Sequence, residues 1–97
     1  MRITKPHILT FSNRGYANNI LPGFIDTQRL RSLIDVTAKN KSASLSDVEN
    51  DMVATIPVKR FGDTSEIAAV AAFLASPAAS YVNGVNIPVD GGKTGSI

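Results

Sequence analysis

Apolar residues along the chain define two short strands around a long helical stretch. The first strand is expected at about residues 16–21, with Ile20 near its end. Proline cannot donate to a strand ladder and glycine is free to take positive φ, so the strand ends at Pro22-Gly23. Residues 85–89 alternate apolar and polar positions, which predicts a half-buried strand. Pro88 confines that strand to the edge of a sheet.

Three helices are expected between these strands, because apolar residues recur there at helical spacing. Their expected bounds are about 28–39, 45–55 and 64–75. The sequence therefore predicts a β-α-α-α-β unit, an α/β fold in one small domain of 97 residues, with parallel strands joined by a right-handed crossover. The first helix has an apolar stripe at Leu30, Leu33, Ile34, Thr37 and Ala38.

Polar residues at the expected helix starts match N-terminal caps. Asp26 and Thr27 precede the first helix, and Ser44 precedes the second. Asp63, followed three residues later by Glu66, gives an Asp-led analogue of the capping box at the start of the third helix.

The third helix is apolar on nearly all sides. Ile67, Val70, Ala71 and Leu74 form one face, and alanines make much of the rest apolar. A helix of this kind is expected to be buried on more than one side. Alanines on its second face would let another helix approach closely.

The loop after the first strand is the best candidate for a binding site. Ligands of α/β sheets bind in loops at the carboxyl ends of strands, and the free N–H groups of a following helix suit an anion. The candidate residues are Pro22, Gly23, Ile25 and Thr27. A plain strand-to-helix turn with an N-cap explains these four residues as well, and the residues alone favour it.

Composition and charge argue against several classes of function. The net charge of +2 is small and the basic residues are scattered, so no nucleic-acid partner is expected. The absence of cysteine excludes a disulfide framework and a thiolate metal site. Asp47, Glu49 and Asp51 point in different directions on a helix, so no metal site is expected there.

No signal peptide is expected, because Pro6 and His7 interrupt the apolar run. No stretch reaches membrane-spanning length, and a cytoplasmic location is expected.

Four motifs lie in order along the chain, at residues 18–27, 56–63, 73–84 and 89–92. Together they resemble the C-terminal part of short-chain dehydrogenases/reductases, and most of all the 3-oxoacyl-[acyl-carrier-protein] reductases. Residues 18–27 resemble the segment after that family's sixth strand, which holds the nicotinamide end of NAD(P). Residues 56–63 resemble the lead-in to its penultimate helix, and residues 73–84 the end of that helix. Residues 89–92 resemble its last strand and exit.

The resemblance implies the C-terminal part of a Rossmann-type, doubly wound parallel sheet whose N-terminal nucleotide-binding half is absent. It implies hydride transfer between NADP or NAD and a small-molecule carbonyl or alcohol substrate. Pro22 and Gly23 would shape the cofactor loop, the backbone of Ile25 would meet the nicotinamide carboxamide, and the Thr27 hydroxyl would bond the carboxamide or a phosphate oxygen. The region of residues 28–39 would belong to the lid over the substrate.

The residues that perform the family's reaction are not in this sequence. The family uses a Ser and a Tyr-x-x-x-Lys pair, but Tyr16 is followed four residues later by Ile20, and Tyr81 by Val85. No three glycines have the Gly-x-x-x-Gly-x-Gly spacing with which the family binds its cofactor. No catalytic residue is therefore assigned. We expect the chain alone to be inactive and to bind the cofactor weakly or not detectably.

Residues 1–15 do not resemble the family and form a leader before the family part at 16–97. Residues 7–11 favour an extended conformation and residues 12–15 a turn. A strand, a hairpin arm and a disordered leader all stay open. His7 has no second histidine and no cysteine near it, so a surface or linker role is expected rather than a ligand role.

Two interpretations of different class follow. The chain is part of an NAD(P)-dependent oxidoreductase, or it is a stand-alone, non-catalytic remnant that acts as an oligomerising module. In both cases we expect a homo-oligomer with contacts through residues 64–75 and 85–89. The reason is that the strand at 16–21 has lost the neighbours of a full parallel sheet, which would leave an open edge.

Overall fold

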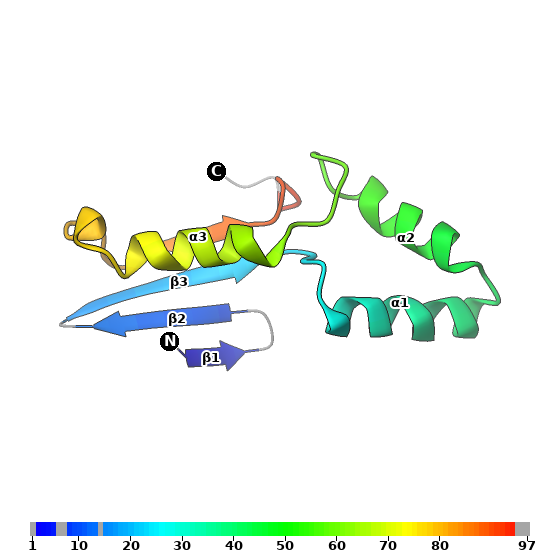
Figure 1. Cartoon of the computed structure of the whole chain (residues 1–97), viewed down its shortest axis with the longest axis horizontal. Coiled ribbons are helices and arrows are strands. Elements are labelled where there is room, and N and C mark those ends of the chain that lie inside the picture. The colour runs from blue at the N-terminus through cyan, green and yellow to red at the C-terminus, as the bar shows by residue number, and fades with distance from the viewer. Residues whose placement is uncertain (1, 6–7, 14, 95–97) are drawn as a thin grey trace.

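The computed structural model of the chain describes residues 2–5, 8–13 and 15–94 (Figure 1). A sheet carries one helix against its face, and a pair of helices extends beyond the ends of the strands. The elements in chain order are β1 (Arg2–Lys5), β2 (Ile8–Asn13), β3 (Tyr16–Pro22), α1 (Gln28–Lys41), α2 (Leu45–Ala54), α3 (Thr64–Leu74), a single 3₁₀ turn η1 (Pro77–Ala79) and β4 (Asn86–Val89).

The sheet has the strand order β1-β2-β3-β4. β4 pairs with β3 in parallel, with Ile20 opposite Ile87. β2 pairs with β3 in the antiparallel sense, and β1 pairs with β2 in the same way. The predicted parallel pair and its β-α-α-α-β connection are therefore confirmed. Pro88 lies on β4, at an edge of the sheet as expected.

The expectation that the strand at 16–21 has an open edge is wrong. β2 runs along that edge, from Leu9 opposite Ile20 to Asn13 opposite Tyr16. The extended tendency of the leader is realised as one arm of a hairpin, with Gly15 in its turn at a φ of 85°. His7 lies outside the described residues. The edge is covered because unpaired backbone groups on one strand pair with any extended neighbour that the chain can bring alongside.

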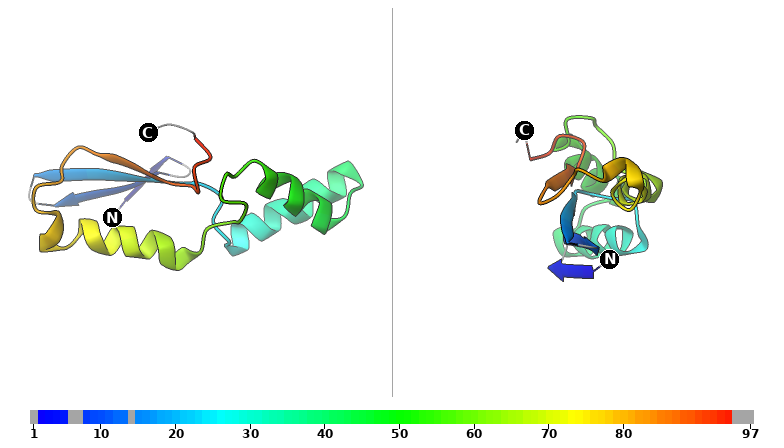
Figure 2. Two further views of the ribbon diagram at one scale, coloured as in Figure 1. Left: turned by 90° about the horizontal axis from the view of Figure 1, so that it is seen from above. Right: turned by 90° about the vertical axis from the view of Figure 1, so that its left-hand side faces the viewer.

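The α1–α2 pair forms a lobe of its own. Figures 1 and 2 show these two helices beyond the carboxyl ends of β3 and β4, while α3 lies along one face of the sheet. The molecule is accordingly elongated, with extents of 50 × 23 × 20 Å. No helix in the described part of the chain is long and apolar enough to cross a lipid bilayer.

The lobe has its own apolar core. Leu30, Ile34 and Ala38 of α1 pack with Val48 of α2, and each of the four is at most 7% exposed. Residues four apart share one face of a helix, which places the three α1 residues together. Leu33 was expected in the same stripe but is 50% exposed. The predicted stripe is wider than the face that α2 covers.

α3 starts with the expected capping box but is not buried as expected. The Asp63 carboxylate accepts from the Ser65 N–H at 3.0 Å, and Glu66 accepts from the Asp63 N–H at 2.8 Å. However, no residue of α3 is buried, and Phe73 is 45% exposed. Burial on more than one side is wrong for this chain by itself, because only the sheet side of the helix is packed.

Candidate functional site

The loop after β3 is held against the exit of β4 at Gly23. The Gly23 N–H donates to the Val89 carbonyl at 2.9 Å. A Cβ placed on Gly23 would lie 2.6 Å from the Asp90 Cβ and 2.8 Å from the Asp90 Cα. Real Cβ atoms do not come so close to other carbons, so only glycine fits here without a shift of the backbone. The close packing of Gly23 therefore fixes the position at which the chain leaves β3, after Pro22, and enters the loop.

Ile25 is placed by a short parallel bridge to Gly62, in the segment that leads to α3. The Gly62 N–H donates to the Phe24 carbonyl at 2.9 Å, and the Asp26 N–H donates to the Gly62 carbonyl at 2.8 Å. Both bonds use the residues on either side of Ile25. No described residue accepts a hydrogen bond from the Ile25 N–H. The Ile25 N–H is therefore a backbone donor without a described acceptor, on a residue whose two neighbours are both bonded to Gly62.

Thr27 is the N-cap of α1. Its hydroxyl oxygen accepts from the Leu30 N–H at 3.2 Å, and its φ of −128° is extended. A hydroxyl can accept and donate at the same time, so the Thr27 O–H proton stays available for a ligand. The plain reading of Thr27 as a cap is thus confirmed, and it is compatible with a binding role for the same side chain.

A cleft of about 560 Å³ opens between the loop, α1 and α3. All four sequence-predicted residues line it, namely Pro22, Gly23, Ile25 and Thr27. Its volume is in the range of small-molecule sites. The structure therefore gathers the predicted residues at one concave surface.

The remaining cleft walls come from elements far apart in the sequence. They are Leu9 of β2, Phe24 of the loop, Arg29, Leu30 and Leu33 of α1, and Thr64 and Ile67 of α3. Sequence reasoning missed most of these residues. The sequence held one indication of these cleft residues. Arg29 and Leu33 are four apart and so share a helix face, and Thr64 and Ile67 share one at a spacing of three.

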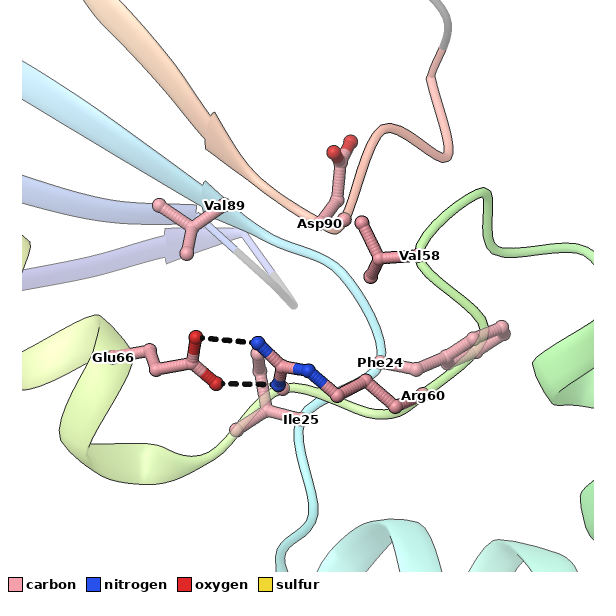
Figure 3. A pocket seen from close by; sticks show the side chains of 9 residues that line it. Phe24, Ile25, Val58, Arg60, Glu66, Val89 and Asp90 are labelled. Atoms are coloured by element: carbon pink, nitrogen blue, oxygen red, sulfur yellow. Dashed lines mark hydrogen bonds and ion pairs between the residues drawn. The ribbon is translucent and has the colours of Figure 1, made fainter.

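A second, smaller cavity of about 110 Å³ lies beside Ile25 (Figure 3). Arg60 and Glu66 reach toward one another there and form two bonds, of 2.8 and 3.0 Å. The Arg60 guanidinium, with help from the Asp63 N–H, lowers the pKa of Glu66 to about 2. Glu66 is therefore an anion near neutral pH with its acceptors engaged, a structural role rather than that of a proton donor.

Arg31 joins the loop after β3 to both helices of the lobe. Its Nε and one terminal nitrogen each bond the Asp26 carboxylate at 2.9 Å, and its other terminal nitrogen bonds Glu49 at 2.9 Å. The guanidinium also lies over the Phe61 ring, 5.7 Å from its centre. The hydrogen bonds from Arg31 lower the pKa of Asp26. Nothing in the sequence indicates these contacts.

The acidic residues of α2 do not gather into a metal site. Glu49 is engaged with Arg31, and Asp47 and Asp51 are exposed. Among the residues that the structure describes, no group of three histidine, cysteine, aspartate or glutamate side chains could hold a metal ion.

Comparison with known proteins places this geometry in a family. The sequence model described as enoyl-(acyl carrier protein) reductase matches residues 14–94. The crystal structure of a short chain dehydrogenase family protein from Francisella tularensis superposes with a TM-score of 0.79 at 32% identity, covering 84% of this chain and 34% of that one. The chain belongs to the short-chain dehydrogenase/reductase family.

Two curated members of the short-chain dehydrogenase/reductase family show how much of a full protein is present. The NADPH-dependent reductase BacG of Bacillus subtilis is 41% identical over 92 residues, which is 95% of this chain and 33% of BacG. The 3-oxoacyl-[acyl-carrier-protein] reductase MabA of Mycobacterium tuberculosis is 41% identical over 76 residues, covering 78% of this chain and 26% of MabA. The chain thus spans about a quarter to a third of these relatives. The predicted resemblance is confirmed, and the boundary after residue 15 stays a prediction.

Proposed function

We propose that this chain supplies the nicotinamide-side loop, the substrate lid and the subunit-contact elements of an NAD(P)-dependent oxidoreductase. The observation that carries the proposal is the convergence of Pro22, Gly23, Ile25 and Thr27 on one cleft, where the Ile25 N–H and the Thr27 hydroxyl proton have no described acceptor. The Ile25 N–H suits the carbonyl oxygen of a carboxamide. The Thr27 O–H suits either a carboxamide oxygen or a phosphate oxygen. BacG, a relative over most of this chain, is named as an NADPH-dependent reductase.

The residues present suit a bound nicotinamide. Gly23 lets the loop approach Asp90 closely, which fixes the loop where it lines the cleft. The bound dinucleotide would supply or accept the hydride. This chain would hold the nicotinamide ring by its carboxamide and exclude water with the apolar walls of Phe24, Leu33 and Ile67. The α1–α2 lobe, which lies beyond the strand ends, would act as the lid over the substrate.

Proton transfer is not assigned to any residue of this chain. Neither tyrosine has a lysine four residues later, and a positioned acid is typically worth about 10²–10⁴-fold in rate. The chain alone is therefore expected to give no turnover of NADPH with a 3-ketoacyl thioester. A carbonyl or alcohol substrate and a cytoplasmic location belong to the same proposal, and both rest on the sequence.

Homo-oligomer contacts through residues 64–75 and 85–89 are the second part of the proposal. Ala69, Ala72 and Phe73 are exposed on α3, and among the described strands β4 is paired on one side only, with β3. These same surfaces support the alternative in which the chain is a non-catalytic, oligomerising remnant. The two functions differ in whether the cleft binds a nicotinamide.

A chimera with BacG tests the proposal. The matching third of BacG is replaced by this chain, and NADPH consumption is measured beside native BacG. We expect a working chimera in which Thr27→Val raises the KM for NADPH about tenfold, the loss of one hydrogen bond to a bound ligand. Thr55→Val is the matched control, because the Thr55 hydroxyl bonds the Met52 carbonyl away from the cleft. A folded chimera whose KM is unchanged by Thr27→Val would contradict the assignment.

A further inference from the structure

Arg29 differs from the other arginines whose side chains the structure describes. Arg31 is paired with Asp26 and Glu49, and Arg60 is paired with Glu66. Arg29 forms no hydrogen bond or ion pair with any described residue. It lines the cleft on α1, two residues after Thr27. An arginine has five N–H donors, so this side chain has its full capacity for an anionic ligand.

The rest of the cleft wall contains no other charge. No aspartate, glutamate or lysine is among its lining residues, and Asp26, close by in sequence, is bound on both oxygens by Arg31. Leu9, Leu33 and Ile67 add apolar surface from three different elements. The cleft therefore combines a long apolar wall with a single positive charge.

We propose that Arg29 makes this cleft selective for carbonyl substrates that carry an anionic group on an apolar chain. The apolar chain lies against Leu33 and Ile67, and the carboxylate or phosphate pairs with the guanidinium. The four-residue spacing of Arg29 and Leu33 puts the charge and the apolar contact on one helix face. This inference rests on the proposed function, because it names the substrate class for the same cleft.

The test compares two ligands of equal shape that differ in charge. The 97-residue chain is titrated with 7-oxooctanoate and with 7-oxooctanamide, and dissociation constants are read from amide chemical shifts of the cleft residues. We expect the oxo acid to bind about three- to fivefold more tightly than the amide, the effect of an ion pair at an exposed site. Arg29→Gln should abolish the difference, and Arg29→Lys should restore most of it.

Lys39→Gln is the matched control. It removes the same charge from the same helix, ten residues or about 15 Å further along. Lys39 does not line the cleft, so its variant should keep the preference of the native chain. Equal binding of acid and amide by the native chain, failure of both to bind, or a preference that survives Arg29→Gln would each overturn the inference.

A second pair of probes identifies the source of the anion. Reduced nicotinamide mononucleotide carries a phosphate, and reduced nicotinamide riboside does not. If Arg29→Gln weakens only the mononucleotide and leaves the oxo acid unaffected, Arg29 serves the cofactor and the substrate assignment is wrong. If Thr27→Val leaves the KM of the BacG chimera for NADPH unchanged, the proposed function fails, and that result is separate from the preference of the native chain for the oxo acid.

Discussion

Gly23 and Asp90 are 67 positions apart in the sequence, yet a Cβ on Gly23 would stand 2.6 Å from the Asp90 Cβ. This approach ties the end of β3, where Gly23 lines the cleft, to the exit of β4. The Gly23 N–H adds a 2.9 Å bond to the Val89 carbonyl at the same place. The position of the candidate cofactor loop therefore depends on the absence of a side chain at Gly23.

Gly23→Ala is expected to lower the free energy of unfolding by about 1–3 kcal/mol, the usual cost of inserting a methyl group into a packed site. Urea denaturation followed by circular dichroism measures the change. The control is Gly84→Asn, because Gly84 has a φ of 74°, which asparagine tolerates, and open space around it. An alanine variant as stable as the native chain would show that the two loops can separate freely.

Ile34 and Leu33 are neighbours in sequence with different expected contributions to stability. Ile34 is 3% exposed in the core of the lobe, and Leu33 is 50% exposed at the cleft. Ile34→Ala should lower the free energy of unfolding by about 2–5 kcal/mol. Leu33→Ala should change it by about 0.5 kcal/mol. Denaturant melts of the two variants decide this, and equal losses would mean that α1 is packed in another orientation.

The Glu66 carboxyl should titrate at a lower pH than an ordinary glutamate. Hydrogen bonds from the Arg60 guanidinium and then the Asp63 N–H lower its pKa from 4.5 to about 2. Because the folded value lies below the ordinary one, Glu66 contributes its full stabilisation above about pH 4.5 and loses it as the pH falls toward 2. A carbon-13 titration of the side-chain carboxyl measures this pKa.

Arg60→Met is the informative variant for this titration. It removes the first cause of the shift and leaves the Asp63 N–H bond in place. The pKa of Glu66 should rise but stay below 4.5. A native midpoint near 4.5 would be inconsistent with the bidentate pair.

Ala69→Arg or Ala72→Arg should convert the proposed homo-oligomer to monomer. Both alanines are exposed on α3, where an arginine fits on an isolated chain but not between two closely packed helices. Light scattering coupled to size exclusion, at tens of micromolar protein, measures the mass. Asn50→Arg on the exposed side of α2 is the control and should leave the mass unchanged. A native chain that is monomeric and folded under these conditions would contradict the oligomer.

Local interactions explain why so much of the fold could be predicted from the sequence. Helix starts at Thr27, Ser44 and Asp63 depend on a side chain and an N–H two or three residues away, so they are visible in the sequence. β3 ends at Pro22 because proline has no N–H to donate to a strand ladder. The candidate site residues could likewise be predicted, because they lie in one continuous motif. They are Pro22, Gly23, Ile25 and Thr27.

What only the tertiary structure decided involves partners that are distant along the chain. β2 covers the edge of β3, Arg31 pairs with Glu49, and Arg29 faces a cleft completed by Leu9 and Ile67. Spacing within a helix shows which residues share a face but not which element covers that face. This is why the apolar stripe predicted for α1 includes Leu33, and why the sequence predicts a buried α3. Local propensity and caps act over a few residues, whereas burial depends on which surfaces the whole chain brings together.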